Sequence, residues 1–350
     1  MVRRLPVVAL AVLAMLAAAM LGSASTGLAS ASGNHKHFFW AHGQAPAVST
    51  NALANDLIYH GGGAGPGAIG VETVPAVYIV YWGPDWAAGF NSTDANGQVF
   101  PSSSLQAYTN SFFTNVGGSP WAGVTTQYCK GVLIGSTSCA GVTGAQFVTN
   151  PTGQLKGVWT DPSPVPAAIV ALGLAENLAD DPIAAEAQKA VAHFGYDPQA
   201  TYFVLTPPTT VATGQPVYCG YHTQTTNPDL SGTGQIQYSF IPYLNMSWPG
   251  VGAGGCGMNF VNKTSNSFGN GVWDGYSIVT GHEYAEAISD PDNFVGNQDG
   301  WNDVQGSENG DKCAWTNTQN IALAGNQFAV QPTWSNEAFD AGKNGCAVTR

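Results

Sequence analysis

The stretch DGYSIVTGHEYAEAIS, residues 274–289, decides how the rest of the chain is interpreted. It contains no proline, and Pro291 follows shortly after it, so it predicts a helix that Asp274 can cap. On such a helix His282 and Glu286 project from one face, the arrangement in which two side chains can bind one metal ion. Glu283, next to the histidine, is then placed to contact water activated by that ion.

A second interpretation of the same stretch needs no metal. His282 could be a partly buried helix residue, with Glu283 and Glu286 on a solvated face and the Asp-, Asn- and Gly-rich run that follows forming ordinary turns. Only 9% of the residues in the chain are charged, so a local cluster of carboxylates favours the metal site.

The third metal ligand is expected in the acidic stretch GWNDVQGSENGDKCAW, residues 300–315, which contains Asp303, Glu308 and Asp311. Glutamate zincins take their last ligand from a carboxylate well past the helix motif, and Glu308 fits that reach. Asp311 and Asp290 are alternative ligands. Asp290 lies one turn beyond Glu286, but the proline that follows it can pull it off the helix face.

Zinc suits a site of histidine nitrogen and carboxylate oxygen, with three protein ligands and one open position. Two carboxylates and one imidazole neutralise the charge of the ion, so this site should acidify water less than a site with two histidines. Calcium and manganese are alternatives because both accept oxygen-rich ligand sets, and calcium could bind in or near the loop Gly300 to Trp315.

The first residues indicate export. Arg3 and Arg4 precede the apolar run LPVVALAVLAMLAAAMLG, and Ala29-Ser30-Ala31 forms a plausible cleavage site, so residues 1–31 are predicted to be a signal peptide. The protein is then secreted, with no membrane span after cleavage. Residues 32–54 lack periodicity and are predicted to be a flexible leader or short propeptide, whose His35, His37 and His42 could bind metal opportunistically.

The remaining residues, 55–350, are numerous enough for one large domain or two small ones, and a chain with 44% hydrophobic residues can support a packed core. We expect a single domain over residues 55–350. The formal charge of −12 becomes −14 once Arg3 and Arg4 are lost, since residues 1–31 contain no acidic residue. A nucleic-acid partner is therefore excluded. We expect a monomer that acts on a peptide or protein substrate.

Six cysteines in an exported chain, with no CxxC pair among them, favour three disulfides over a metal–thiolate site. Sequence alone leaves the pairing open. The order along the chain favours closure between nearest neighbours: Cys129 with Cys139, Cys219 with Cys256, and Cys313 with Cys346.

Strands are predicted at residues 76–83, 201–207 and 238–246, with loops between the last two around Cys219 and His222. Helices are predicted over residues 101–118, 166–179 and 181–195, the last one capped by Asp181. Strands and helices alternate irregularly, which indicates a mixed α/β domain of α+β character.

YSIVTGHEYAEAISDP, followed by Gly300, Trp301, Asp303, Gly306 and ENGDKCAW, resembles a family of secreted proteins common in actinobacteria and other soil bacteria, often labelled protease-like. The resemblance extends over nearly all of the chain after the signal peptide, through VYIVYWGPDW, VTTQYCKGV, GVWTDPSP, AVAHFG, YFVLTP, CGMNFVN and FAVQPTWSNEA.

LIYHGG, VYIVYWG and the His-Glu-x-x-Glu helix are similar, more distantly, to the plant EXORDIUM or phosphate-induced proteins, which are extracellular and linked to growth signalling. That family shares the positions of His282, Glu283 and Glu286 and has equivalents of Glu308 and Asp311. Both families depart from zincin peptidases, which have histidine where Glu286 stands.

These observations lead to one disulfide-stapled, zincin-like domain with an active-site helix beside a mixed sheet. The expected function is a zinc-dependent endopeptidase. His282, Glu286 and Glu308 would hold the ion, and Glu283 would act as general base and pass a proton to the leaving amine. Asp311 would contact the ligands from outside the coordination shell, or replace one of them as a ligand.

Two other functions remain open. In the first, the chain is a non-enzymatic extracellular binding or signalling protein, in which calcium or zinc holds the loop Gly300 to Trp315 against the helix. In the second, it is a serine or carboxyl peptidase. No GxSxG element occurs, and Asp161, Glu176 and Asp180 are acid candidates without a defined partner.

Overall fold

The computed structural model describes residues 36–44, 55–62, 68–170, 181–213, 218–226, 234–246, 254–291 and 300–350. These residues belong to one compact unit, Gly33–Arg350. The predicted signal peptide, residues 1–31, lies outside the described ranges, as do Glu176 and Asp180. No helix within the described ranges has the length and apolar character that a membrane crossing requires.

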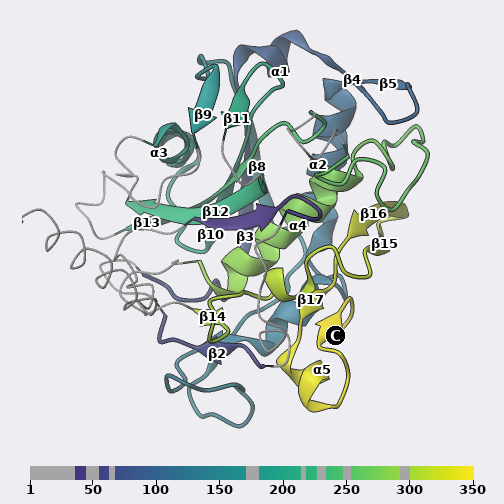
Figure 1. Cartoon of the computed structure of the whole chain (residues 1–350). Helices are drawn as coiled ribbons and strands as arrows, with labels where there is room; N and C mark the ends of the chain where they lie inside the picture. Colours follow the sequence, from purple (N-terminus) through teal and green to yellow (C-terminus); the bar gives the residue numbers. More distant parts are fainter. Residues whose placement is uncertain are drawn as a thin grey trace, which may run out of the picture. The chain divides into compact units, whose positions relative to one another are not determined.

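A six-stranded mixed sheet forms the centre of this unit, in the order β1-β12-β13-β10-β3-β8 (Figure 1). Four strands run parallel to one another: β3 (Ala76–Trp82), β8 (Leu155–Asp161), β10 (Ala200–Leu205) and β13 (Gln235–Ile241). Two strands at one end pair antiparallel: β12 (Tyr218–Thr226) with β13, and β1 (His37–Trp40) with β12. The mixed α/β class and the mixed sheet are as predicted.

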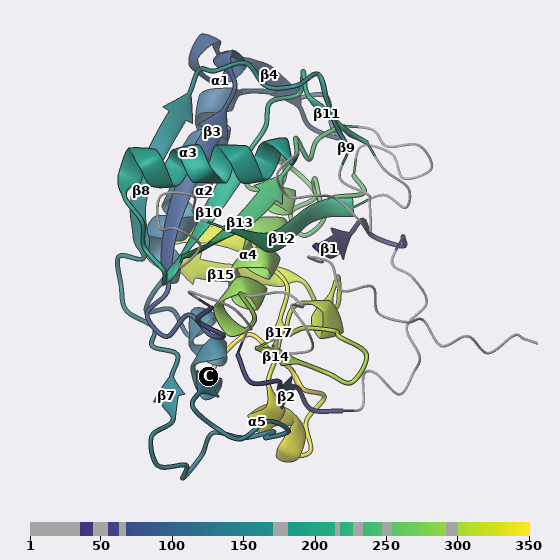
Figure 2. The same cartoon turned by 90° about the vertical axis from the view of Figure 1, so that its left-hand side faces the viewer.

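Helices cover both faces of the sheet (Figure 2). Side chains alternate along β10, so that Phe203 contacts Phe113 of α2 (Ser102–Val116) while Tyr202 stacks on Tyr78. Tyr78 in turn contacts Phe194 of α3 (Pro182–Phe194) on the opposite face. α3 begins as predicted, since the Asp181 side chain accepts a hydrogen bond from the backbone N–H of Ile183.

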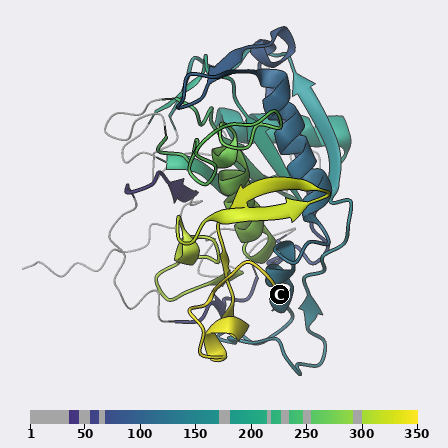
Figure 3. The same ribbon diagram turned by 90° about the vertical axis from the view of Figure 1, so that its right-hand side faces the viewer.

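Helix α4 (Asp274–Ser289) matches the predicted helix and is buried along its whole length. It contacts β12 and β13 on one side and the hairpin of β15 (Gln319–Leu323) and β16 (Asn326–Val330) on another (Figure 3). On the hairpin side, the Ser277 hydroxyl donates a hydrogen bond to the carbonyl of Ala329. Asp274 does not cap the helix as predicted, because its carboxylate accepts hydrogen bonds from Val261, Asn262 and Gly271 instead.

Two predictions of irregular structure are wrong. Residues 218–226 form strand β12, and its Tyr and Thr residues favour a strand. His222 and Gln224 interrupt the apolar pattern by which the strand could have been predicted. Residues 37–40 of the predicted flexible leader form β1, because pairing with β12 orders a segment too short to show periodicity. The helix predicted over 166–179 is wrong at Ala168–Val170, which is strand β9, and residues 171–180 lie outside the described ranges.

The predicted pairing of the cysteines is confirmed. Cys129 bonds to Cys139, Cys219 to Cys256, and Cys313 to Cys346. The second disulfide ties β12 to the segment that leads into α4. The third ties the acidic stretch after α4 to the strand β18.

The remaining elements are short. They are the helices α1 (Pro84–Ala88) and α5 (Asn336–Asp340), the 3-10 helices Ala122–Gln127 and Asp311–Cys313, and the two-stranded pairs β2 (Ile58–Tyr59) with β14 (Trp301–Asn302), β4 (Asn91–Thr93) with β5 (Val99–Pro101), β6 (Cys129–Lys130) with β7 (Gln146–Phe147), β9 with β11 (Val211–Thr213), β15 (Gln319–Leu323) with β16 (Asn326–Val330), and β17 (Thr333–Trp334) with β18 (Cys346–Ala347).

Glycine at position 275 lets α4 approach the backbone of Cys256. An alanine there normally favours a helix by about 1 kcal/mol, but its Cβ would lie 2.2 Å from the Cys256 carbonyl oxygen, which the disulfide to Cys219 helps to fix. We expect Gly275→Ala to lower the free energy of unfolding by about 2 kcal/mol in a urea titration. Gly281→Ala is the control, because its Cβ would meet no backbone atom and only the ring edges of Trp121 at 3.2 Å and Phe112 at 3.4 Å. Equal stability of the two variants would contradict this account.

Candidate metal centre

Helix α4 carries three ionisable side chains into the protein interior. His282 and Glu283 are 0% exposed, and Glu286 is 1% exposed. The interpretation of Glu283 and Glu286 as a solvated helix face is therefore wrong. Buried carboxylates need a positive partner or a proton, and the surroundings of the helix show which groups are available.

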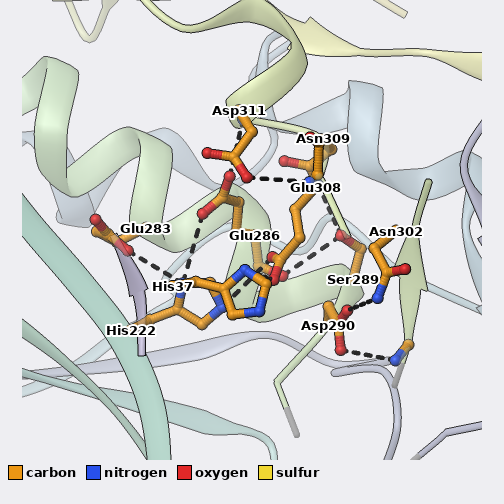
Figure 4. A network of polar contacts seen from close by, with 12 residues as sticks. His37, His222, Glu283, Glu286, Ser289, Asp290, Asn302, Glu308, Asn309 and Asp311 are labelled. Carbon is orange, nitrogen blue, oxygen red and sulfur yellow. Dashed lines mark hydrogen bonds and ion pairs between the residues drawn. The ribbon is translucent and has the colours of Figure 1, made fainter. Parts of the chain in front are cut away.

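Two groups of side chains in the described ranges could hold a metal ion, and they share Glu286. The first is His282, Glu286 and Asp311, and the second is His222, Glu286 and Glu308. They come from α4, from β12 and from the acidic stretch after α4, so three distant parts of the chain meet at one place (Figure 4). The predicted ligands His282, Glu286 and Glu308 are brought together around Glu286, but His282 and Glu308 fall into different groups.

The donor atoms of the first group lie close enough together to surround one metal ion. Nε2 of His282 lies 3.0 Å from Oε2 of Glu286 and 3.8 Å from Oδ1 of Asp311. Donor atoms around tetrahedral zinc lie about 3.3–3.6 Å apart, since the bonds are about 2.0–2.2 Å long. Within the described ranges, neither Nε2 of His282 nor Oε2 of Glu286 makes a hydrogen bond, although both are buried. An ion between them would satisfy both atoms.

The second group is arranged as a bridge. Nδ1 of His222 lies 3.1 Å from Oε2 of Glu283 and 3.5 Å from Oε2 of Glu286, whereas its other nitrogen, Nε2, lies 3.4 Å from Oε2 of Glu308. Because the two nitrogens of one imidazole point in opposite directions, one ion cannot bind both. His222 therefore connects Glu283 with Glu308.

The structure also places the alternative ligands. Asp311, predicted as a substitute, faces His282 directly. Asp290 belongs to neither group, since its carboxylate accepts hydrogen bonds from the Gly300 backbone at 2.7 Å and the Asn302 side chain at 3.0 Å. Asp303 accepts hydrogen bonds from Gln305, Ser307 and Lys312, so that donors already contact both of its carboxylate oxygens.

Asn309 fixes the acidic stretch to α4. Its Nδ2 donates to the Ala285 carbonyl and the Ser289 hydroxyl, both at 2.7 Å. The next residues complete the attachment: the backbone N–H of Asp311 donates to Oε1 of Glu286 at 2.9 Å, and the Gln331 side chain donates to the Gly310 carbonyl. Glu308 and Asp311 are thereby held on the side of the helix that presents Glu286.

Sequence reasoning missed two residues of this centre. His222 lies on β12, which was taken for a loop. His37 was named only as an opportunistic metal ligand, yet its Nδ1 lies 2.5 Å from Oε1 of Glu308, and its ring lies 5.4 Å from that of His222. The signal that could have placed β1 is the run of aromatic residues in HFFW, which favours a strand but is too short to be distinctive.

Burial governs the ionisation of the centre. It lowers the pKa of His282 to about 4, so the imidazole is neutral at pH 7 and keeps a lone pair for a ligand bond. Loss of solvation raises the pKa of Glu286 to about 8 and that of Asp311 to about 7. Burial, reinforced by Glu286 and Asp311, raises the pKa of Glu283 well above its usual range. Such crowded carboxylates favour the binding of a cation.

The centre is covered on most sides. The side chain of Asp311 is 30% exposed and that of His37 is 15% exposed, whereas those of His222, His282 and Glu308 are at most 1% exposed. Phe39 of β1 stacks on the His282 ring at a centroid distance of 4.0 Å. Solvent therefore reaches the centre beside Asp311 and His37, and β1 closes the rest of this side.

The third predicted function, a non-metal peptidase, has no comparable site in the described ranges. Asp161 accepts hydrogen bonds from the backbone and hydroxyl of Ser163 and lies 3.5 Å from Lys189, which pairs with Glu186 at 2.7 Å. Lys189 is positively charged in this arrangement because both carboxyl groups raise its pKa, so it cannot activate Ser163 as a base.

Comparison of the chain with protein-family models, with curated proteins and with solved structures gives no match.

Glycine at position 310 allows the acidic stretch to lie against the ligands. An added Cβ would be 2.7 Å from Nδ1 of His282 and 2.8 Å from Oε1 of Glu286, and it would displace both side chains. We expect Gly310→Ala to weaken zinc binding at least ~10-fold in a competition titration with a chromophoric chelator, as supporting contacts of metal ligands typically do. Gly123→Ala is the control, since its Cβ would meet nothing closer than 3.5 Å. Unchanged zinc affinity in Gly310→Ala would argue against a site at His282 and Glu286.

Proposed function

We propose that the chain is a secreted, zinc-dependent endopeptidase with a zincin-like fold. The observation that carries the proposal is the single nitrogen of His282, Nε2, which faces carboxylate oxygens of both Glu286 and Asp311 at spacings that suit zinc. The position of α4 against the antiparallel end of a mixed sheet supports the zincin-like assignment. Three disulfides support an oxidising compartment.

His282, Glu286 and Asp311 would hold the ion in this proposal. Imidazole nitrogen disfavours calcium, which prefers oxygen ligands throughout, and this favours zinc for the centre. Glu308, the third ligand expected from the sequence, would instead act through His222. When bound, the ion would polarise the carbonyl of a peptide bond and make water more acidic.

Glu283 would supply the general base. It neighbours His282 on α4, is fully buried, and contacts Nδ1 of His222 through Oε2 at 3.1 Å. The other oxygen of Glu283, Oε1, would take the proton of an attacking water molecule once the bound ion has lowered the pKa of this carboxyl group. The same carboxyl group would then give that proton to the leaving amine. His222 would orient Glu283 and hold it next to Glu286.

Because β1 covers the metal centre, a second function is also supported, that of a non-enzymatic binding protein. With β1 in place, Phe39 lies on His282 and His37 lies on Glu308. A metal that clamps β12, α4 and the acidic stretch would stabilise an extracellular binding protein without any reaction. The peptidase would need Glu283 for turnover, whereas the binding protein would function without it.

The test is Glu283→Gln, which keeps the size of the side chain and removes the base. We expect the zinc-loaded wild-type chain to cleave members of a mixed peptide library, and the variant to lose at least ~100-fold in kcat with its zinc content unchanged. Glu337→Gln, on an exposed ion pair with Arg350, is the matched control and should retain full activity.

Both variants and the wild type are to be assayed as intact chains and after a cut between residues 44 and 55 that frees β1. Full zinc occupancy without cleavage in either form would refute the peptidase and leave the metal clamp.

A further inference from the structure

Strand β1 is held at the edge of the sheet, beside α4 and the metal centre (Figure 1). In the sheet it pairs with β12 alone, antiparallel, with His37 opposite His222 and Phe38 opposite Tyr221. None of the three disulfides includes a residue of 36–44. β1 is therefore attached by hydrogen bonds and side-chain contacts, and an extended peptide could make the same backbone pairing with β12.

The side chains of β1 alternate between two environments, as those of a bound extended peptide would. His37 and Phe39 face the metal centre, where they contact Glu308 and His282. On the other face, Phe38 contacts Tyr218 and Tyr221 of β12 at centroid distances of 5.0 and 5.5 Å. One face of β1 therefore covers the metal centre, and its other face packs against aromatic side chains of β12.

Phe39 occupies an aromatic slot. Its ring is 0% exposed and lies between His282, at 4.0 Å, and Trp315, at 4.8 Å, both in stacked geometry. Trp315 also donates a hydrogen bond from Nε1 to the carbonyl of Trp40 at 2.8 Å. A ring in this slot is held directly over one of the proposed metal ligands.

The backbone of Trp315 supports a specific role for the slot. Its φ of +56° is in the left-handed region, which costs a residue with a side chain about 1 kcal/mol or more. Such a conformation persists only where the surroundings impose it. Here it places the indole against Phe39 and its N–H on the backbone of β1.

We propose that the edge of β12 is the binding site for an extended peptide with an aromatic residue, and that β1 is an inhibitory strand that occupies this site. The catalytic consequence depends on the proposed peptidase function, whereas the exchange of β1 for another peptide does not. A substrate would take the place of β1, pair with β12 and put its aromatic side chain between His282 and Trp315. The intact chain is then latent because its own Phe39 fills the slot.

The experiment uses the full chain, oxidised and loaded with zinc, with a recognition sequence for a site-specific protease placed within residues 45–54. After the cut, gel filtration shows whether the fragment that contains β1 leaves. A fluorescently labelled synthetic peptide KHFFWAHGQ, residues 36–44, is then titrated against the released protein. We expect the fragment to leave and the peptide to bind, with the Phe39→Ala peptide at least ~10-fold weaker.

A peptide of the same composition in scrambled order is the control and should not bind. The inference is overturned if the fragment stays on the cut protein through gel filtration. It is also overturned if loss of the fragment unfolds the protein, as measured by circular dichroism, because β1 would then be a structural strand.

Activity separates this inference from the proposed function. We expect the released protein to cleave library peptides with an aromatic residue near the cleaved bond, and the synthetic peptide to inhibit it. Binding of the peptide without any cleavage would retain the strand site and refute the peptidase. Cleavage that the synthetic peptide does not inhibit would retain the peptidase and refute the inhibitory strand.

Discussion

The burial of carboxylates on α4 is the constraint on which the rest of the structure depends. Glu283 and Glu286 are enclosed with His282 in the interior, where an unpaired charge would be strongly destabilising. Each neighbouring segment meets this constraint in its own way. β12 provides His222 and the acidic stretch provides the backbone N–H of Asp311, while β1 places His37 in contact with Glu308 of that stretch. His282, Glu286 and Asp311 are left close enough together that they could hold a cation.

Segments far apart in sequence are held at α4 by covalent and polar ties. The disulfide Cys219–Cys256 joins β12 to the chain just before the helix, and Asn309 joins the acidic stretch to its last turn. Lys312 adds a buried ion pair with Asp303 at 3.0 Å. These ties hold the ligands in place before any ion binds, which lowers the entropy that metal binding would otherwise have to overcome.

Local patterns in the sequence predicted the elements whose signals are local. A run without proline located α4, the Asp181-Pro182 pair located the start of α3, and the order of the cysteines located the disulfides. The helical spacing of His282 and Glu286 placed both on one face of α4, with Glu283 beside them. β12 and β1 could not be predicted in this way, because their strand character comes from pairing with distant residues. His222 and His37 were missed for that reason, and the position of Asp311 against His282 depends on a turn that the sequence does not specify.

The disulfide between Cys313 and Cys346 has a consequence for the timing of assembly. Cys313 is two residues from Asp311, and its partner is 33 residues further along the chain. Closing a loop of that length contributes on the order of 3–4 kcal/mol. The turn that carries Asp311 would thus gain much of its rigidity only after oxidation. For a chain exported as we propose, maturation of the centre would follow export, because disulfides form and persist in oxidising compartments.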